Sequence, residues 1–292
     1  MINSLNAVFE KQDIKINLEA ESQKKFFDKN GYCVIEKSEL PVEKFAEIID
    51  FLLEKEAWRG GWEGKEEYMK YGKNFQPGAY RLGNLFNKDE LFFELITNEE
   101  VLNIILAILG DDAKIGALDM REPKKGTGQQ DLHIDWIPKK ESEATENIVI
   151  MIFLDDADEN NGHLRVVPKT HKLKGWIEEN TKEKTKHKDE IFLDVKKSSI
   201  VFMDANLWHS GTTNKTGQRR RVLFMDIRRR SIPQLLNQRI YLDEVVQNKL
   251  TDVQKYLLGL GENDSVFEDR VFTAGNVYRK EFKTDSFVKM ED

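Results

Sequence analysis

Two histidines and one aspartate are spaced so that they could bind a single metal ion. His133 and Asp135 are separated by one residue in the segment 129–136, and His209 lies far downstream in the segment 207–211. A strand alternates its side chains between two faces, so a strand at 132–137 would direct His133 and Asp135 to the same side. Two histidines and one carboxylate on one face of a metal leave the opposite positions open, as in non-haem Fe(II) oxygenases. A His-x-Asp triplet is common by chance, and a strand histidine hydrogen-bonded to a neighbour is the simpler alternative.

Three consecutive arginines follow His209 and suit a dicarboxylate co-substrate. Arg219, Arg220 and Arg221 lie on what should be the next strand, where alternation directs Arg220 opposite to its two neighbours. An arginine grips a carboxylate through two parallel hydrogen bonds, which suits the far end of 2-oxoglutarate. The later cluster 228–230, also three arginines, is predicted to be a solvated strand end.

Composition limits the classes of protein to which the chain can belong. Hydrophobic residues make up 39% of the 292 residues, which is enough for a sizeable core. The formal net charge of −7 argues against nucleic acid as a partner, because phosphate binding requires a basic surface. The single cysteine, Cys33, excludes an intrachain disulfide and fits a reducing compartment. No signal-peptide core or membrane-length apolar run is found, so we expect a cytoplasmic protein with no membrane partner. The oligomeric state is left open.

Hydrophobic periodicity divides the chain into helices, then strands, then helices. Helical signals cover 18–29, 45–53, 101–109 and parts of 233–261. Strand patterns cover 32–35, 114–122, 132–137, 147–154, 162–167, 198–203 and 221–227, and the apolar run 147–154 predicts a strand buried on both faces. Residues 1–18 are predicted to be a loose arm. Residues 58–83 are predicted to be an irregular connection, which either covers a site or packs its own aromatic side chains.

This order predicts one domain over residues 1–292, mainly β with flanking helices. Its β-core spans about 113–230, its helical N-terminal part 18–110 and its C-terminal helical extension 233–292. A block of short strands separated by turns closes into a sandwich or barrel. We expect a double-stranded β-helix (jelly roll, cupin-like) core, because its antiparallel strands can bring His133 and Asp135 beside His209.

Several sequence blocks around these residues form one pattern. They are the segments 125–136, 153–157, 161–171 and 207–211, then Asn214-Lys215-Thr216 and Arg220. Together they resemble the phytanoyl-CoA dioxygenase family of Fe(II)/2-oxoglutarate-dependent oxygenases, from about residue 22 to residue 230. The resemblance implies that His133, Asp135 and His209 ligate iron and that Arg220 binds 2-oxoglutarate.

Two residues depart from the family's pattern and leave alternatives open. Thr213 stands where a proline is common, and Arg219 also differs, so Arg219 or Arg221 remains an alternative to Arg220 as the 2-oxoglutarate clamp. Family members add a polar group near the first histidine that contacts 2-oxoglutarate. Gln130 is the candidate for that group, with a solvated strand-edge amide as the alternative.

The resemblance also implies a reaction. It indicates an Fe(II)- and 2-oxoglutarate-dependent dioxygenase that uses O2 to hydroxylate a C–H bond of a small-molecule substrate, with succinate and CO2 as co-products. The carboxylate of Asp135 favours hydroxylation over halogenation, because related halogenases have a small residue there. The alternatives are a non-redox metal-dependent cupin-type enzyme, such as an isomerase or hydrolase, and a binding protein on a degenerate oxygenase fold.

The substrate cannot be identified from the sequence. Arg121, Lys124 and Lys125 precede the first ligand and suggest either an anionic substrate or an ordinary charged surface. Arg81, in the segment 58–83, could contact substrate or pack within that segment.

Overall fold

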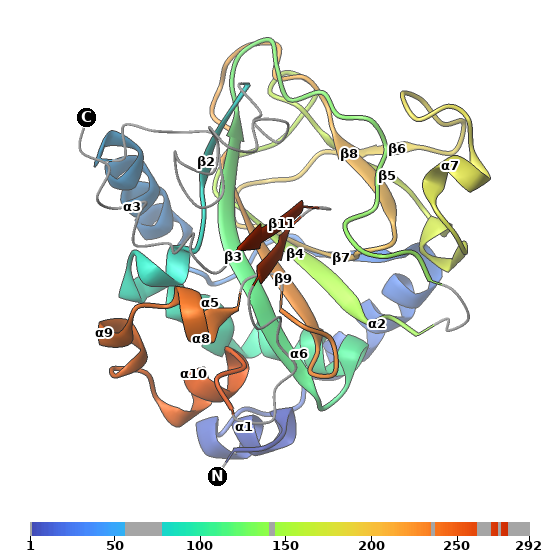
Figure 1. Ribbon diagram of the computed structural model, residues 1–292. Helices are drawn as coiled ribbons and strands as arrows, with labels where there is room; N and C mark the ends of the chain where they lie inside the picture. Colours follow the sequence, from blue (N-terminus) through green and yellow to red (C-terminus); the bar gives the residue numbers. More distant parts are fainter. Residues whose placement is uncertain are drawn as a thin grey trace.

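The computed structural model describes residues 2–55, 78–139, 144–234, 237–261, 270–273 and 276–279. Two antiparallel sheets form the core of the described chain (Figure 1). The larger has the strand order β1(Tyr32–Ile35), β7(Ile200–Asp204), β4(Asn147–Phe153), β9(Val222–Arg229), β3(Ala113–Pro123), β2(Ala79–Leu82). The smaller has the order β6(Ile191–Leu193), β5(Leu164–Val167), β8(Trp208–Gly211). Two further strands, β10(Arg270–Thr273) and β11(Asn276–Arg279), pair with each other.

Most of the described helices gather around the larger sheet, whereas α7(Ile177–Asn180) lies beside the smaller sheet (Figure 1). The described helices are α1(Leu5–Gln12), α2(Leu18–Asn30), α3(Val42–Lys55), α5(Phe93–Thr97), α6(Glu99–Leu109), α7, α8(Gln238–Tyr241), α9(Glu244–Gln247) and α10(Asp252–Leu257). Local chemistry sets the ends of the two helices that cover the sheet. The Asn98 side chain accepts a hydrogen bond from the Val101 amide at the start of α6, and α2 ends at Gly31, where φ is +86°. No helix within the described ranges combines the length and the apolar composition that crossing a membrane requires.

Strand β4 shows why the apolar run 147–154 is buried on both faces. Its residues Ile148, Ile150 and Ile152 belong to the cluster that packs with the helices. The alternate residues Val149, Met151 and Phe153 belong to a second cluster, which includes Leu164 and Val166 of the smaller sheet. The larger sheet is therefore a middle layer between helices and the smaller sheet. Full burial of one such side chain contributes about 1.5–3 kcal/mol.

The structure corrects three of the sequence-based expectations. Residues 1–18 are not a loose arm, because α1 is capped by Ser4 and buries Leu5, Val8 and Phe9. Residues 132–137 do not form a strand and contribute one isolated bridge, at His133. Of the segment 58–83, residues 58–77 lie outside the described residues, while 79–82 form β2 rather than an irregular connection. The single domain over 1–292 stays a prediction.

Two of the three consecutive arginines tie α3 to the sheets. The guanidinium of Arg221 donates two hydrogen bonds to Asp155, at 2.9 and 2.7 Å, and one to Asp50 of α3 at 2.9 Å. Arg219 binds Asp50 at 2.7 Å and also pairs with Glu122 on β3. Burial raises the pKa of Asp155, but its hydrogen bonds to Arg221 outweigh burial, so the pKa lies below its usual value.

We expect Asp155→Asn to destabilise the protein by about 2 kcal/mol at neutral pH, because it removes the carboxylate that pairs with a largely buried arginine. Since the folded pKa of Asp155 is depressed, its contribution is complete above the unfolded pKa of about 3.9 and declines as the pH falls through the folded pKa. Urea unfolding as a function of pH should therefore show wild type and variant converging below about pH 4.

Asp156→Asn is the matched control, because Asp156 is an adjacent carboxylate whose side chain is 52% exposed. It should cost less than about 1 kcal/mol. Equal stability of Asp155→Asn and wild type at neutral pH would contradict a stabilising role for the Asp155–Arg221 pair.

Candidate metal centre

Direct backbone pairing brings the two distant histidines together. The His133 amide donates to the His209 carbonyl at 3.0 Å, and the His209 amide donates to the His133 carbonyl at 3.1 Å. His209 lies on β8, whose residues pair with β5, so its position is set by the smaller sheet. The Asp135 amide donates to the Ala205 carbonyl at 2.7 Å, which holds the loop that follows His133. The loop and β8 together place the three side chains at one end of the sandwich.

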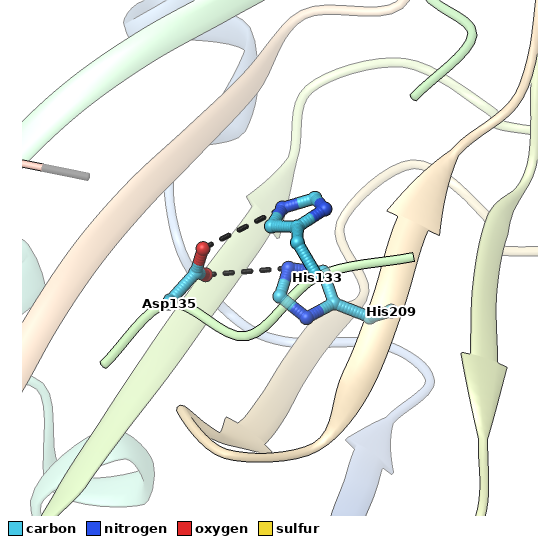
Figure 2. A group of neighbouring side chains, drawn as sticks. All are labelled: His133, Asp135 and His209. Atoms are coloured by element: carbon cyan, nitrogen blue, oxygen red, sulfur yellow. Dashed lines mark ion pairs between the residues drawn. The ribbon is translucent and has the colours of Figure 1, made fainter. Parts of the chain in front are cut away.

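The carboxylate of Asp135 faces both imidazole rings (Figure 2). Its Oδ1 lies 3.6 Å from His133 Nε2, and its Oδ2 lies 3.3 Å from His209 Nε2. One ligand atom from each residue can be chosen so that all three lie within 4.8 Å of one another. Three adjacent ligands of an octahedral ion, each bound at about 2.1 Å, lie about 3 Å apart, so the geometry suits a single ion.

Hydrogen bonds from the far side of each ring orient the histidines. His133 Nδ1 lies 2.9 Å from the Asp131 carbonyl oxygen, and His209 Nδ1 lies 2.9 Å from the Leu207 carbonyl oxygen. A carbonyl can only accept, so each Nδ1 must carry the proton, and the lone pair of the neutral ring lies on Nε2. Metal-binding histidines commonly have such a partner, which fixes both tautomer and ring orientation.

The local electrostatics favour a charged Asp135 and a neutral His133. Burial and, to a smaller extent, the neighbouring His209 lower the pKa of His133 to about 4. Burial alone would raise the pKa of Asp135, but the two histidines and Arg81 lower it to about 2. Burial opposes protonation of His209, yet Asp135 raises its pKa overall. His133 and Asp135 are therefore held in the neutral and charged forms, respectively, in which these residues bind a metal ion.

The three residues border a cavity of about 510 Å³ between the two sheets. Its apolar wall comes from alternate residues of β4 and β9, namely Val149, Met151, Phe153, Val222 and Phe224. A cavity of this volume, with an apolar wall and a few polar groups, is typical of a site for a small molecule.

Arg220 borders the same cavity, whereas its two neighbours do not line it. It is 6% exposed and donates from Nη1 to the Gly162 carbonyl at 2.6 Å. Its Nε has no hydrogen-bond partner among the described residues. A buried donor without an acceptor is costly, so this guanidinium suits an anion in the cavity. The alternatives Arg219 and Arg221 instead form ion pairs with Asp50. Of the three arginines, Arg220 is the one that lines the cavity.

Gln130 lies on the same side of the cavity as Arg220. Its Oε1 accepts a hydrogen bond at 3.3 Å from the amide of Gly211, the last residue of the strand β8 that carries His209. A Cβ added at Gly211 would lie 3.2 Å from this Oε1 and 3.4 Å from Arg220 Nη2. The side chains of Gln130 and Arg220 therefore both lie close to Gly211, as expected if both face one ligand.

Some charged residues of the site were not assigned from the sequence. Asp119 and Asp226 line the cavity, and neither stood out in the strand patterns. Alternation along β3, with Met120 between the charged residues Asp119 and Arg121, is the signal that would have indicated a polar face toward the cavity. Arg228 is not a solvated strand end, because it is fully buried, pairs with Asp226 at 2.7 Å and lies over the Trp136 ring.

Comparisons with known proteins agree with this architecture. The model of the family described as Phytanoyl-CoA dioxygenase (PhyH) matches residues 27–222. A search of curated proteins finds no match. Among solved structures, the non-heme alpha ketoglutarate dependent carbocyclase SnoK from nogalamycin biosynthesis is 18% identical, with a TM-score of 0.55 over 73% of this chain and 85% of that chain.

Two other solved structures show the same fold. HygX from Streptomyces hygroscopicus, with nickel, 2-oxoglutarate and hygromycin B bound, is 14% identical, with a TM-score of 0.55 over 71% of this chain and 86% of that chain. The epimerase SnoN, in complex with Fe3+, alpha ketoglutarate and nogalamycin RO, is 14% identical, with a TM-score of 0.53 over 74% and 86%.

The fold and the site together define the class of Fe/2-oxoglutarate-dependent oxygenase folds. The chain belongs to the phytanoyl-CoA dioxygenase (PhyH) family. This confirms the resemblance and the expected fold class, mainly β with flanking helices around a jelly-roll core.

We expect Gly162→Ala to destabilise the protein and to displace Arg220. Gly162 has φ of +104°, and an added Cβ would lie 2.5 Å from the Thr212 carbonyl oxygen and 2.7 Å from Arg220 Nη1. Gly126→Ala is the matched control, because φ there is +76° and nothing lies within 4 Å of the added Cβ. Both variants carry the strain of a left-handed residue, about 1–2 kcal/mol, so the difference between them in urea unfolding isolates the clash. Equal unfolding midpoints would contradict the tight contact between Gly162 and Arg220.

Proposed function

We propose that this chain is an Fe(II)- and 2-oxoglutarate-dependent dioxygenase that hydroxylates a C–H bond of a small-molecule substrate. In this proposal His133, Asp135 and His209 bind the iron, and Arg220 binds the distal carboxylate of 2-oxoglutarate. The observation that carries it is that one cavity contains both the three candidate ligands and a buried arginine with an unmatched donor.

The donor set fits this metal and this co-substrate. Two imidazoles and one carboxylate on one side of the ion leave positions for a bidentate co-substrate and O2. The family supports the assignment, as do the neighbouring structures whose titles name iron or nickel together with 2-oxoglutarate or alpha ketoglutarate. The buried guanidinium of Arg220 suits the second carboxylate of 2-oxoglutarate, which agrees with the position of Arg220 in the sequence pattern.

The protein's own groups orient the reactants and exclude water. Iron with 2-oxoglutarate and O2 would supply the oxidising chemistry, converting the C–H bond to C–OH with succinate and CO2 as co-products. The Nδ1 hydrogen bonds of His133 and His209 hold both rings with Nε2 toward Asp135. Arg220 fixes the far end of the co-substrate, with Gln130 beside it. The apolar wall keeps water from the place where the substrate's C–H bond must lie.

Hydroxylation is the outcome that we propose for this oxidation. Asp135 occupies the carboxylate position that related halogenases leave small, which argues against chloride at the metal. The titles of two neighbours name a carbocyclase and an epimerase, so the fold also accommodates other outcomes. Mass spectrometry of the product distinguishes them, because hydroxylation adds one oxygen atom to the substrate.

We expect Asp135→Ala to reduce 2-oxoglutarate-dependent succinate formation by at least about 100-fold, because it removes a metal ligand. Succinate is measured by mass spectrometry after incubation with Fe(II), 2-oxoglutarate and O2. Asp156→Asn, which changes an exposed carboxylate, should keep the wild-type rate. Wild-type turnover by Asp135→Ala would remove this carboxylate from the ligand set.

Arg220→Gln should raise the KM for 2-oxoglutarate by about 10- to 100-fold, because it removes a charge-assisted hydrogen-bond pair. Arg219→Gln is the control, since Arg219 is the neighbouring arginine and its side chain is 45% exposed outside the cavity. An equal rise in KM for 2-oxoglutarate in both variants, or a rise in Arg219→Gln alone, would contradict the assignment of Arg220 as the residue that binds 2-oxoglutarate.

A further inference from the structure

Asp119 on β3 is a buried carboxyl in the wall of the cavity, apart from the candidate metal ligands and Arg220. Its side chain lines the cavity, and the residue is 8% exposed. Asp119 lies opposite Phe224 of β9, and Phe224 lies opposite Met151 of β4, so the three residues form one row across the sheet (Figure 1). Phe224 and Met151 also line the cavity. Asp119 is thus the polar member of an otherwise apolar row.

The backbone fixes one oxygen of this carboxyl. Oδ1 accepts a hydrogen bond from the Asn84 amide at 2.9 Å. No described residue donates a hydrogen bond to the other oxygen, Oδ2, and Oδ2 is not sealed off by the surrounding atoms. The bond from Asn84 therefore holds the carboxyl in one orientation and leaves a hydrogen-bond acceptor open to the cavity.

Ion pairing does not occupy Asp119 either. Asp226, the neighbouring carboxylate on this wall, accepts two hydrogen bonds from Arg228 at 2.8 and 2.7 Å. Asp119 forms no such pair with a described residue. Burying a carboxyl without a full set of partners is costly, so folding stability does not explain its presence in this row.

The protonation of Asp119 agrees with an acceptor that lacks a partner. Burial raises the pKa of Asp119 to about 7, and the charge of Asp226 adds to the rise. The Asn84 amide and the charges of Arg81 and Lys88 act in the opposite direction and are outweighed. A bound group that donates a hydrogen bond would stabilise the charged form of this carboxyl.

Asp119 is displaced from Arg220 along the wall of the cavity. Arg220, Val222 and Phe224 all line the cavity, at alternate positions of one segment. Four residues of extended chain, from Arg220 to Phe224, span about 13 Å. If the proposed function holds, 2-oxoglutarate bound at Arg220 would therefore leave the row of Asp119 and Phe224 to the substrate.

We propose that Asp119 is a substrate-binding residue, which accepts a hydrogen bond from a hydroxyl or amino group of the substrate. Phe224 and Met151, in the same row, would contact the carbon body beside that group. The substrate class is therefore a small, mainly apolar molecule that carries a hydrogen-bond donor. This inference rests on the proposed function and adds the substrate class to it.

Binding of matched probes tests this role without turnover. The full chain is loaded with Zn(II) and 2-oxoglutarate at about pH 8, where the carboxyl of Asp119 is mostly charged, and dissociation constants are measured by ligand-detected NMR. The probes are 3-phenylpropan-1-ol, 3-phenylpropan-1-amine and 2-phenylethyl methyl ether, an isomer of the alcohol that lacks a donor. The alcohol, the amine or both should bind about tenfold or more tightly than the ether, because only they can donate to the carboxylate. The tighter of the two identifies the natural donor as a hydroxyl or an amino group.

Asp119→Asn separates this role from a purely structural one. The amide oxygen of the new side chain can still accept from the Asn84 amide, so its NH2 group takes the place of Oδ2. The preference for the alcohol or the amine over the ether should therefore fall toward one, while the affinity for 2-oxoglutarate changes by less than about threefold. Asp156→Asn, which changes an exposed carboxylate, should keep the wild-type preference. If Asp119→Asn fails to fold, the wild-type comparison of the donors with the ether still decides the proposal.

Two results would overturn this assignment. The first is a wild-type protein that binds the ether as tightly as the alcohol and the amine, or that binds neither donor. The second is an Asp119→Asn variant that keeps the full preference for a donor, because the hydrogen bond would then be made elsewhere in the cavity. Failure of the wild type to bind 2-oxoglutarate would instead contradict the proposed function, and the comparison of the donors with the ether, made without 2-oxoglutarate, would still report on Asp119.

Discussion

The pair of backbone hydrogen bonds between His133 and His209 is the interaction on which the site depends. The backbone of each residue donates one hydrogen bond to the other and accepts one from it. A change in the register between the two segments would therefore break both bonds. The loop that carries His133 and Asp135 has little regular structure of its own and is held by this bridge and by the bond from Asp135 to Ala205. The smaller sheet is thus the rigid support, and the loop takes its position from β8. One candidate ligand, His209, thus lies on a strand, and the backbone hydrogen bonds of His133 and Asp135 hold the other two beside it, as a metal site with defined geometry requires.

Three consecutive arginines have different roles because their side chains lie on different sides of the segment that precedes β9. Arg219 and Arg221 pair with acidic residues, and both reach Asp50 on α3. Arg220 points the other way, into the cavity between the sheets. The outer two attach a helix to the β-core, and the inner one directs its charge toward the cavity. Stability and the proposed co-substrate binding therefore depend on adjacent residues, and substitutions in this run should separate the two effects.

Much of the architecture follows from sequence periodicity. The strand Tyr32–Ile35 was predicted with its observed bounds, and the apolar run 147–154 is buried on both faces as expected. The prediction of a strand at 132–137 was wrong, since the backbone of Asp135 bonds to Ala205 rather than continuing a ladder. The convergence of His133 with Asp135 was expected from strand alternation but arises from a loop held by β8. The short strand β8 and the helix α1 have no clear period, and tertiary packing determines both.

The charged groups of the cavity show the limit of sequence reasoning. Arg121 was noted as a basic residue before the first ligand, but an ordinary surface explained it equally well. Only the strand register shows that it lies opposite Arg81, and only the fold shows that both face the cavity. Asp119 carried no local signal apart from alternation. Alternation within one strand shows which of its side chains share a face. Which charged side chains lie next to each other on that face depends on the register with the neighbouring strand.

In the proposed enzyme, one ferrous ion binds His133, Asp135 and His209, and Arg220 anchors 2-oxoglutarate beside it. The most direct measurement is the visible absorption spectrum of the metal-free protein, titrated anaerobically with Fe(II) and then with 2-oxoglutarate. We expect a weak charge-transfer band that appears only when both Fe(II) and 2-oxoglutarate are present and that is absent in His209→Ala. A wild-type protein that binds Fe(II) but gives no such band with saturating 2-oxoglutarate would contradict it.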